Sequence, residues 1–99
     1  MRLTPKEQTT IRETVSALAG PGSRVRLFGS RLDDLARGGD IDLMVEVDHD
    51  VAQPALFSAQ IGARLQQALG DRRIDIVITA PNLREQPIHR VARETGVAL

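Results

Sequence analysis

Residues 38–47 read Gly-Gly-Asp-Ile-Asp-Leu-Met-Val-Glu-Val, and the predicted architecture depends most on this segment. After the glycine pair, Ile41, Leu43, Val45 and Val47 alternate with other side chains, which predicts a strand over 41–47 with one apolar face. Side chains two positions apart leave the same face of a strand, so Asp40 and Asp42 should lie together at its head. A slip of one residue would bury both carboxylates, and this fixes the register of the strand.

The segments on both sides of this strand alternate between helical and extended patterns. Thr4-Pro5-Lys6-Glu7 has the form of a capping box, so a helix should begin there and end at Gly20. The remaining predicted elements are strands over 25–28 and 73–79, a short helix or turn over 31–36, and helices over 54–70 and up to Gly96. Their order predicts an α/β (α+β) fold, a small mixed sheet of about three strands flanked by helices.

Composition narrows the class of protein. A chain of 99 residues is expected to form a single domain over 1–99. No cysteine, no signal-like start and no long apolar run predict a cytoplasmic protein that does not enter a membrane. The formal net charge is zero and only two residues are aromatic, so direct nucleic-acid binding is not expected.

Acidic residues are concentrated in one part of the chain. Residues 40–63 carry five acidic side chains and no basic one. A further carboxylate, Asp75, is placed within an apolar strand, where it is costly unless it has a partner or a function. If the two strands are neighbours, Asp40, Asp42 and Asp75 form a cluster suited to Mg²⁺. An alternative interpretation stays open at this point, in which Asp40 and Asp42 are simply the solvent-facing polar residues of an alternating strand.

A glycine and a serine directly follow the first predicted strand. Gly29 allows a close approach of the backbone, and Ser30 stands where a helix or turn begins. Exposed N–H groups at such a position favour phosphate. The same two residues are also a common turn and helix cap, so this pair by itself leaves both readings open.

Together these pieces resemble the minimal nucleotidyltransferase (MNT) domains of the DNA polymerase β-like superfamily. The resemblance covers essentially the whole chain. It rests on three segments, which are Leu27-Phe28-Gly29-Ser30-Arg31, Arg37-Gly38-Gly39-Asp40-Ile41-Asp42-Leu43 and Arg73-Ile74-Asp75-Ile76. The spacing departs slightly from the common form, because nine residues rather than ten separate Ser30 from Asp40.

The resemblance implies a nucleotidyltransferase fold and a two-metal transfer of a nucleoside monophosphate, AMP from ATP, to a hydroxyl group. Two Mg²⁺ ions would be held by carboxylates, and one carboxylate would also help to deprotonate the acceptor. By position, the catalytic and metal-binding residues are Asp40, Asp42 and Asp75, and the nucleotide-binding residues are Gly29, Ser30 and Arg31. Arg31 has a second interpretation, as a surface arginine paired with Asp33 or Asp34.

The resemblance also implies a partner. Such short domains are commonly encoded beside a helical HEPN protein, a ribonuclease toxin that the nucleotidyltransferase neutralises as antitoxin, in some systems by adenylylating it. This predicts a protein hydroxyl as acceptor and a homo- or hetero-oligomer. Because Asp33 and Asp34 follow the proposed phosphate site, a non-catalytic module that neutralises its partner by contact alone is the alternative. An antibiotic-modifying enzyme ranks lower, since that activity normally needs a second domain.

Several side chains are expected to be structural. Phe28, Met44 and Phe57 should pack in or near the core, and the last helix carries the apolar residues Ile88, Val91 and Ala92. The two histidines, His49 and His89, lack metal-ligand spacing and are expected at the surface.

Overall fold

A computed structural model describes residues 3–28, 41–70 and 72–99 of the chain. The elements in chain order are α1 (Pro5–Ala19), β1 (Arg24–Phe28), β2 (Ile41–Glu46), α2 (Pro54–Leu69), β3 (Ile74–Thr79), α3 (Pro87–Thr95) and β4 (Val97–Ala98). The short helix or turn expected over 31–36 lies outside the described residues. All the other predicted helices and strands are confirmed, with ends shifted by one or two residues.

The sheet is mixed, as expected, and its strand order is β3-β2-β1-β4. Strand β1 pairs antiparallel with β2 and with β4, whereas β2 and β3 run parallel. The parallel pair requires a crossover connection, which α2 supplies. The sheet has one strand more than the sequence predicted, because the two residues of β4 are too few to show a period.

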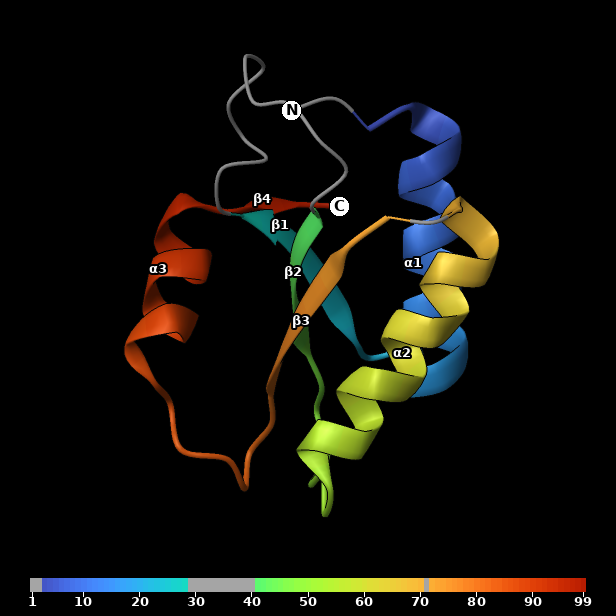
Figure 1. The fold of residues 1–99 in the computed structure, drawn as a ribbon. Coiled ribbons are helices and arrows are strands. Elements are labelled where there is room, and N and C mark those ends of the chain that lie inside the picture. The colour runs from blue at the N-terminus through green and yellow to red at the C-terminus, as the bar shows by residue number, and fades with distance from the viewer. Residues whose placement is uncertain (1–2, 29–40, 71) are drawn as a thin grey trace.

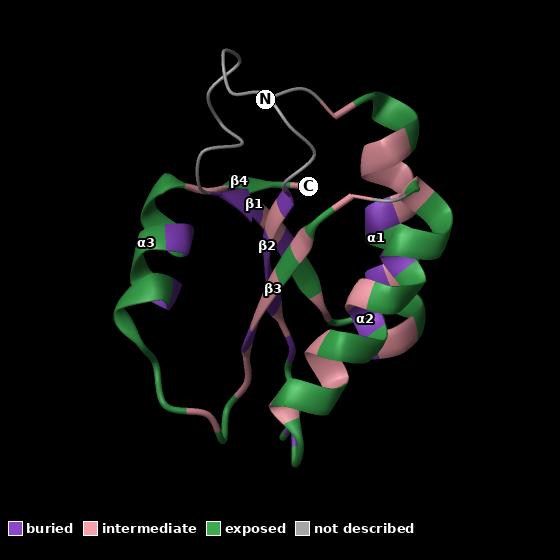
Figure 2. Ribbon diagram, viewed as in Figure 1, coloured by how far each residue is buried: buried purple, intermediate pink, exposed green. Residues whose placement is uncertain are grey.

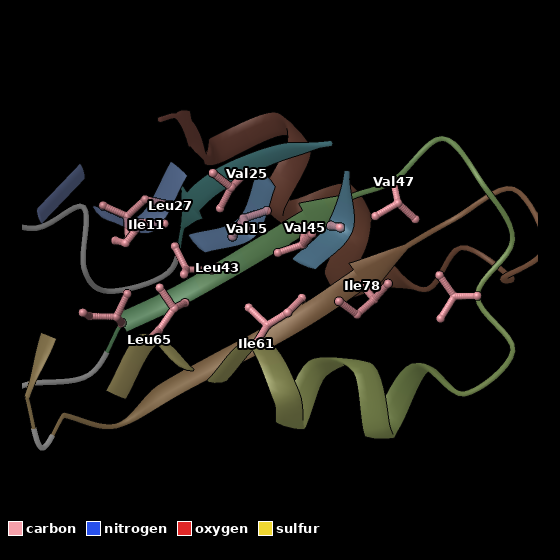
Figure 3. Packing of buried hydrophobic residues seen from close by; sticks show 13 residues of the cluster. Ile11, Val15, Val25, Leu27, Leu43, Val45, Val47, Ile61, Leu65 and Ile78 are labelled. Carbon is pink, nitrogen blue, oxygen red and sulfur yellow. The ribbon is translucent and has the colours of Figure 1, made fainter. Parts of the chain in front are cut away.

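Helices cover the two faces of the sheet unequally. Helices α1 and α2 lie together on one face, and α3 lies alone on the other (Figure 1). Leu43 of β2 lies in the main core between the two helices (Figure 3). The same cluster contains residues of α1 and α2, namely Ile11, Val15, Ile61 and Leu65. The buried members of this main cluster are Ile11, Val15, Ala19, Val25, Leu27, Ile41, Leu43, Val45, Val47, Val51, Ile61, Leu65 and Ile78. Phe57, expected in or near the core, packs against it as a half-buried side chain.

The face under α3 holds a much smaller apolar cluster, made of Phe28, Met44 and Ala92 with Val77 packed against it. Phe28 and Met44 are therefore buried as predicted. On α3, Ile88 and Val91 are 41% and 48% exposed, whereas Ala92 is buried. Helix α3 is buried only along the side that faces the sheet (Figure 2).

The N-terminal helix begins where the sequence indicated. The Thr4 side chain accepts a hydrogen bond from the Glu7 N–H at 3.1 Å, and the Glu7 carboxylate accepts one from the Thr4 N–H at 2.9 Å. Glu7 also forms an ion pair with Arg72 at 2.9 Å. The Thr4 backbone hydrogen bond, together with the charge of Arg72, lowers the pKa of Glu7. These contacts tie the start of α1 to the segment that leads into β3.

Candidate functional site

Two carboxylates meet on the face of the sheet opposite α1 and α2. Asp42 of β2 and Asp75 of β3 are direct partners in the parallel register. Neighbouring strands lie about 4.8 Å apart, and side chains at paired positions leave the same face of a sheet. The condition that the sequence left open is therefore met, because the strand carrying Asp75 lies beside the one carrying Asp42 and the two residues occupy one face.

Strand periodicity explains why Asp42 points away from the main core. Its neighbours Ile41 and Leu43 are 1% and 0% exposed on the side of α1 and α2. Turning Asp42 inward would expose both of these side chains and bury a charge, so the register is strongly fixed. Asp42 itself is half-buried at the head of β2.

Strand β1 ends beside the same carboxylate. Phe28, its last residue, pairs with Asp42 across the antiparallel ladder. Gly29 and Ser30 follow Phe28 directly in the sequence. Phe28, the residue directly before the Gly-Ser pair, therefore lies next to Asp42.

Asp75 lies in a more open environment than Asp42. Its side chain is 52% exposed, and Oδ2 accepts an ion-pair contact from Nε of Arg73 at 3.5 Å. Arg73 is 73% exposed, so water screens much of this attraction. The guanidinium nevertheless supplies positive charge beside two carboxylates that repel each other across neighbouring strands.

Four of the predicted site residues lie outside the described residues, namely Gly29, Ser30, Arg31 and Asp40. The structure thus brings together Asp42 and Asp75, and the third carboxylate of the expected cluster stays a prediction. Within residues 3–28, 41–70 and 72–99, no group of three or more His, Asp or Glu side chains is placed to hold a metal ion.

Further polar groups occupy the same face beneath α3. Nε of Arg26 donates to Glu46 Oε1 at 3.0 Å, joining β1 to β2. A cavity of about 210 Å³ lies between Glu46, the end of β3, and His89 and Arg93 of α3. Arg93 also donates a hydrogen bond to Glu85, which lowers the pKa of Glu85.

His89 was expected at the surface, and that interpretation is wrong, because the residue is only 6% exposed. Its Nδ1 accepts a hydrogen bond at 2.9 Å from the N–H of Gln86, the residue before α3. The histidine thereby satisfies a backbone donor at the start of the helix. A hint was available in the sequence, since His89 occupies the third position of a helix that begins at a proline. His49, in contrast, is exposed as predicted.

Comparison with known proteins agrees with this arrangement. The family model described as "Nucleotidyltransferase domain" matches residues 9–97. The match covers most of the chain, including β1, β2 and β3, and the chain therefore belongs to the nucleotidyltransferase domain family. Among curated proteins, none matches the chain.

The donor chemistry of the pair fits the divalent metal that nucleotidyltransferases generally use. Asp42 and Asp75 offer only carboxylate oxygens, which are hard ligands. Mg²⁺ typically takes one or two carboxylates and leaves its other positions to water and substrate phosphates. Two neighbouring carboxylates with one side open toward solvent match that requirement in ligand type and in access.

Helices of the described residues lack the combined length and apolar character needed to cross a membrane.

Proposed function

We propose that this nucleotidyltransferase moves AMP from ATP to a hydroxyl group of a protein, and that the acceptor is a HEPN-domain partner. Nucleotidyl transfer in general follows from the family. The observation that supports a catalytic centre here is the register pair of Asp42 and Asp75 on the face of the sheet opposite α1 and α2. The protein acceptor, the nucleotide and the partner come from the likeness to MNT domains.

In the proposed reaction, the acceptor oxygen forms a bond to the α-phosphorus while the bond between that phosphorus and its bridging oxygen breaks. Pyrophosphate leaves, and the proton of the hydroxyl passes to the Asp75 carboxylate. Asp42 and Asp75, with Asp40, would hold two Mg²⁺ ions, which would stabilise the negative charge that develops during the transfer. Asp75 suits the role of base because it is the more exposed carboxylate and can be approached by a large acceptor.

The proposed biological role is that of antitoxin in a HEPN/MNT pair that operates in the cytoplasm. Gly29, Ser30 and Arg31 would contact the triphosphate in this scheme. Their proposed position agrees with the described end of β1 beside Asp42.

Intact-mass measurement of the partner tests the proposed function. The protein encoded beside this chain is co-purified with it and incubated with Mg²⁺ and ATP. One or more AMP units should be added to the partner by the wild-type chain and by Asp50→Asn, which alters an exposed loop carboxylate. Asp42→Asn and Asp75→Asn should leave the partner unmodified. An unmodified partner that is nevertheless bound by the wild-type chain would contradict the proposal.

One observation favours the alternative function, neutralisation by contact alone. Arg73 forms an ion pair with Asp75, so a metal ion would have to compete with the guanidinium for this carboxylate. In that case neutralisation of the partner should survive the double substitution of Asp42→Asn and Asp75→Asn. Loss of neutralisation in that double variant, with binding retained, would contradict contact alone.

A further inference from the structure

Strand β3 forms one end of the sheet and has an open outer edge. Within the described residues, β2 is its only partner strand. Backbone groups of alternate residues along a strand point to opposite edges. The carbonyl groups of Arg73 and Thr79 accept bonds from β2, so the odd-numbered residues face β2. The N–H and C=O groups of Ile74, Ile76 and Ile78 consequently point to the open edge.

This edge lacks the features that usually prevent strand pairing. Natural edge strands are commonly very short or carry several charges, a proline or a bulge. Strand β3 has six residues, Ile-Asp-Ile-Val-Ile-Thr, with one charge and no proline. Ile74 and Ile76 belong to the face of the main core but are only half-buried. In Figure 1, β3 lies in front of the other strands and no helix crosses it.

Two cavities beside β3 form a groove, which near Ile78 is also lined by Leu83, Arg84, Gln86 and His89. One cavity of about 400 Å³ lies between α2 and the first half of β3, beside Ile74 and Ile76. A second, of about 290 Å³, continues beside Ile76 and Ile78. Both cavities are bordered by Ser58 of α2 and by Ile76, so they adjoin. On the α2 side the groove is lined mainly by small residues, together with Pro54 and Gln66; the small ones are Ala55, Ser58, Ala59, Gly62 and Ala63.

We propose that this edge binds the same edge of a second copy of the chain, giving a two-fold symmetric dimer with one continuous sheet. In an antiparallel pair centred on Ile76, Ile76 faces its own counterpart and Ile74 faces Ile78. All three pairs are then of the type that exchanges two hydrogen bonds, which satisfies the outward groups of both copies. A contact of this kind is isologous and closes after two chains.

The side chains of β3 are compatible with this pairing in both directions. On the core face, isoleucine pairs with isoleucine at each position, and the half-exposed side chains of Ile74 and Ile76 become more buried in the dimer. On the other face, Asp75 lies opposite Val77 and Arg73 lies opposite Thr79, so no like charges are placed directly opposite each other. This self-complementarity favours a second copy over an unrelated extended peptide.

Helix α2 provides the second part of the proposed contact. Its small residues border the groove and would face those of the other copy across the symmetry axis. A Cβ built on Gly62 would meet only Ile76 Cδ1, at 3.8 Å, which is an ordinary contact. Alanine is therefore tolerated at this position, whereas a longer charged side chain would project into the groove.

Sedimentation with interference optics tests the dimer, because the chain has no Trp or Tyr for absorbance. The wild-type chain and Gly62→Ala should sediment as dimers at about 100 μM. Gly62→Glu places two carboxylates near the axis and should raise the dissociation constant by about 100-fold or more. Should Gly62→Glu fold poorly, Ala59→Glu introduces the same charge at an exposed helical position. A monomeric wild-type chain, or well-folded glutamate variants that remain dimeric, would overturn the proposal.

Hydrogen exchange locates the contact. The amides of Ile74, Ile76 and Ile78 should be protected in the dimer and exchange rapidly in the glutamate variants. The amides of Asp75 and Val77, which face β2, should be protected in both. A dimer whose three outward amides exchange rapidly would place the interface elsewhere and refute the edge pairing. Neither measurement depends on nucleotide transfer, so this proposal can fail independently of the proposed function.

Discussion

The two faces of the sheet differ in how they are built. Among the described residues, the face under α1 and α2 carries thirteen buried apolar residues in one cluster, whereas the face under α3 has three, Phe28, Met44 and Ala92. The α3 face instead carries Asp42, Asp75 and the pair of Arg26 and Glu46. Strand β2 contributes alternate residues to both faces.

The difference shows how a small domain can combine stability with a polar site. Apolar burial on one face supplies the stabilising free energy and fixes the register of β2 and β3. That register then determines where the carboxylates lie, so the α3 face does not have to hold the fold together. Substitutions at adjacent positions of β2 should therefore separate stability from chemistry.

The largest effect is expected from Asp42→Asn. Removing this charge from the candidate centre should reduce nucleotidyl transfer on the order of 10³-fold. The midpoint of urea unfolding should change little, because the substitution conserves shape and the core lies on the other face. Initial rates of pyrophosphate release and the urea midpoint are the two measurements. Retained activity, with Asp50→Asn as matched control, would place the chemistry away from β2.

Leu43→Ala and Met44→Ala form the next comparison. Both side chains are 0% exposed, yet they lie on opposite faces of β2. Loss of Leu43 leaves a cavity in the large cluster and should cost about 3–4 kcal/mol of unfolding free energy. Loss of Met44 from the small cluster should cost about 2 kcal/mol, near the lower limit for such changes. Equal costs in urea unfolding would show that the α3 face contributes as much stability as the other.

A smaller effect is expected from Glu7→Gln, at the start of α1. The pKa of Glu7 is lowered in the folded state, first by the Thr4 backbone hydrogen bond. A lowered pKa contributes stability above the unfolded carboxyl value of about 4.3, and that stability is lost as the pH falls through the folded value. Because glutamine retains the capping hydrogen bonds and only the charge is lost, the substitution should cost about 0.5 kcal/mol at pH 7 and almost nothing near pH 2. A cost that is independent of pH, measured by urea unfolding, would argue against this origin.

The smallest effect concerns the exposed pair of Arg93 and Glu85 on the α3 side. Water and salt screen such pairs, so Arg93→Gln should leave the thermal midpoint unchanged within error. The pKa of Glu85 is lowered mainly by the hydrogen bond from Arg93, and it should rise toward its ordinary value in this variant. Carboxyl titration followed by NMR measures that change. A large fall in the thermal midpoint would mean that this pair anchors α3.

Much of the fold could be predicted because the decisive signals are local. The capping box at Thr4 and the period of residues 41–47 each determine their own element. Packing of α3 could not be predicted in the same way. The nine residues of α3 carry apolar side chains on more than one side of the helix. The buried residues are Ala92 and His89, whose imidazole caps the helix, whereas Ile88 is exposed.

The candidate site was predictable in part for a related reason. Alternation along each strand determines which face Asp42 and Asp75 occupy, and this can be inferred from sequence spacing. Contacts between strands depend on register, which a single sequence does not reveal. The pair of Arg26 with Glu46 was therefore missed, whereas the pair of Arg73 with Asp75, two positions apart along one extended segment, could have been inferred from the same alternation. The roles proposed for Gly29, Ser30, Arg31 and Asp40 stay predictions.

The parallel pairing of β2 with β3 has a kinetic consequence. A tight turn cannot join parallel strands, so they meet only after α2 has bridged them. Such distant contacts form slowly, because the entropy of closing the intervening chain is lost before the contacts compensate for it. The carboxylates of Asp42 and Asp75 are therefore assembled late during folding. Recovery of transferase activity after dilution from denaturant would time the arrival of β3 beside β2.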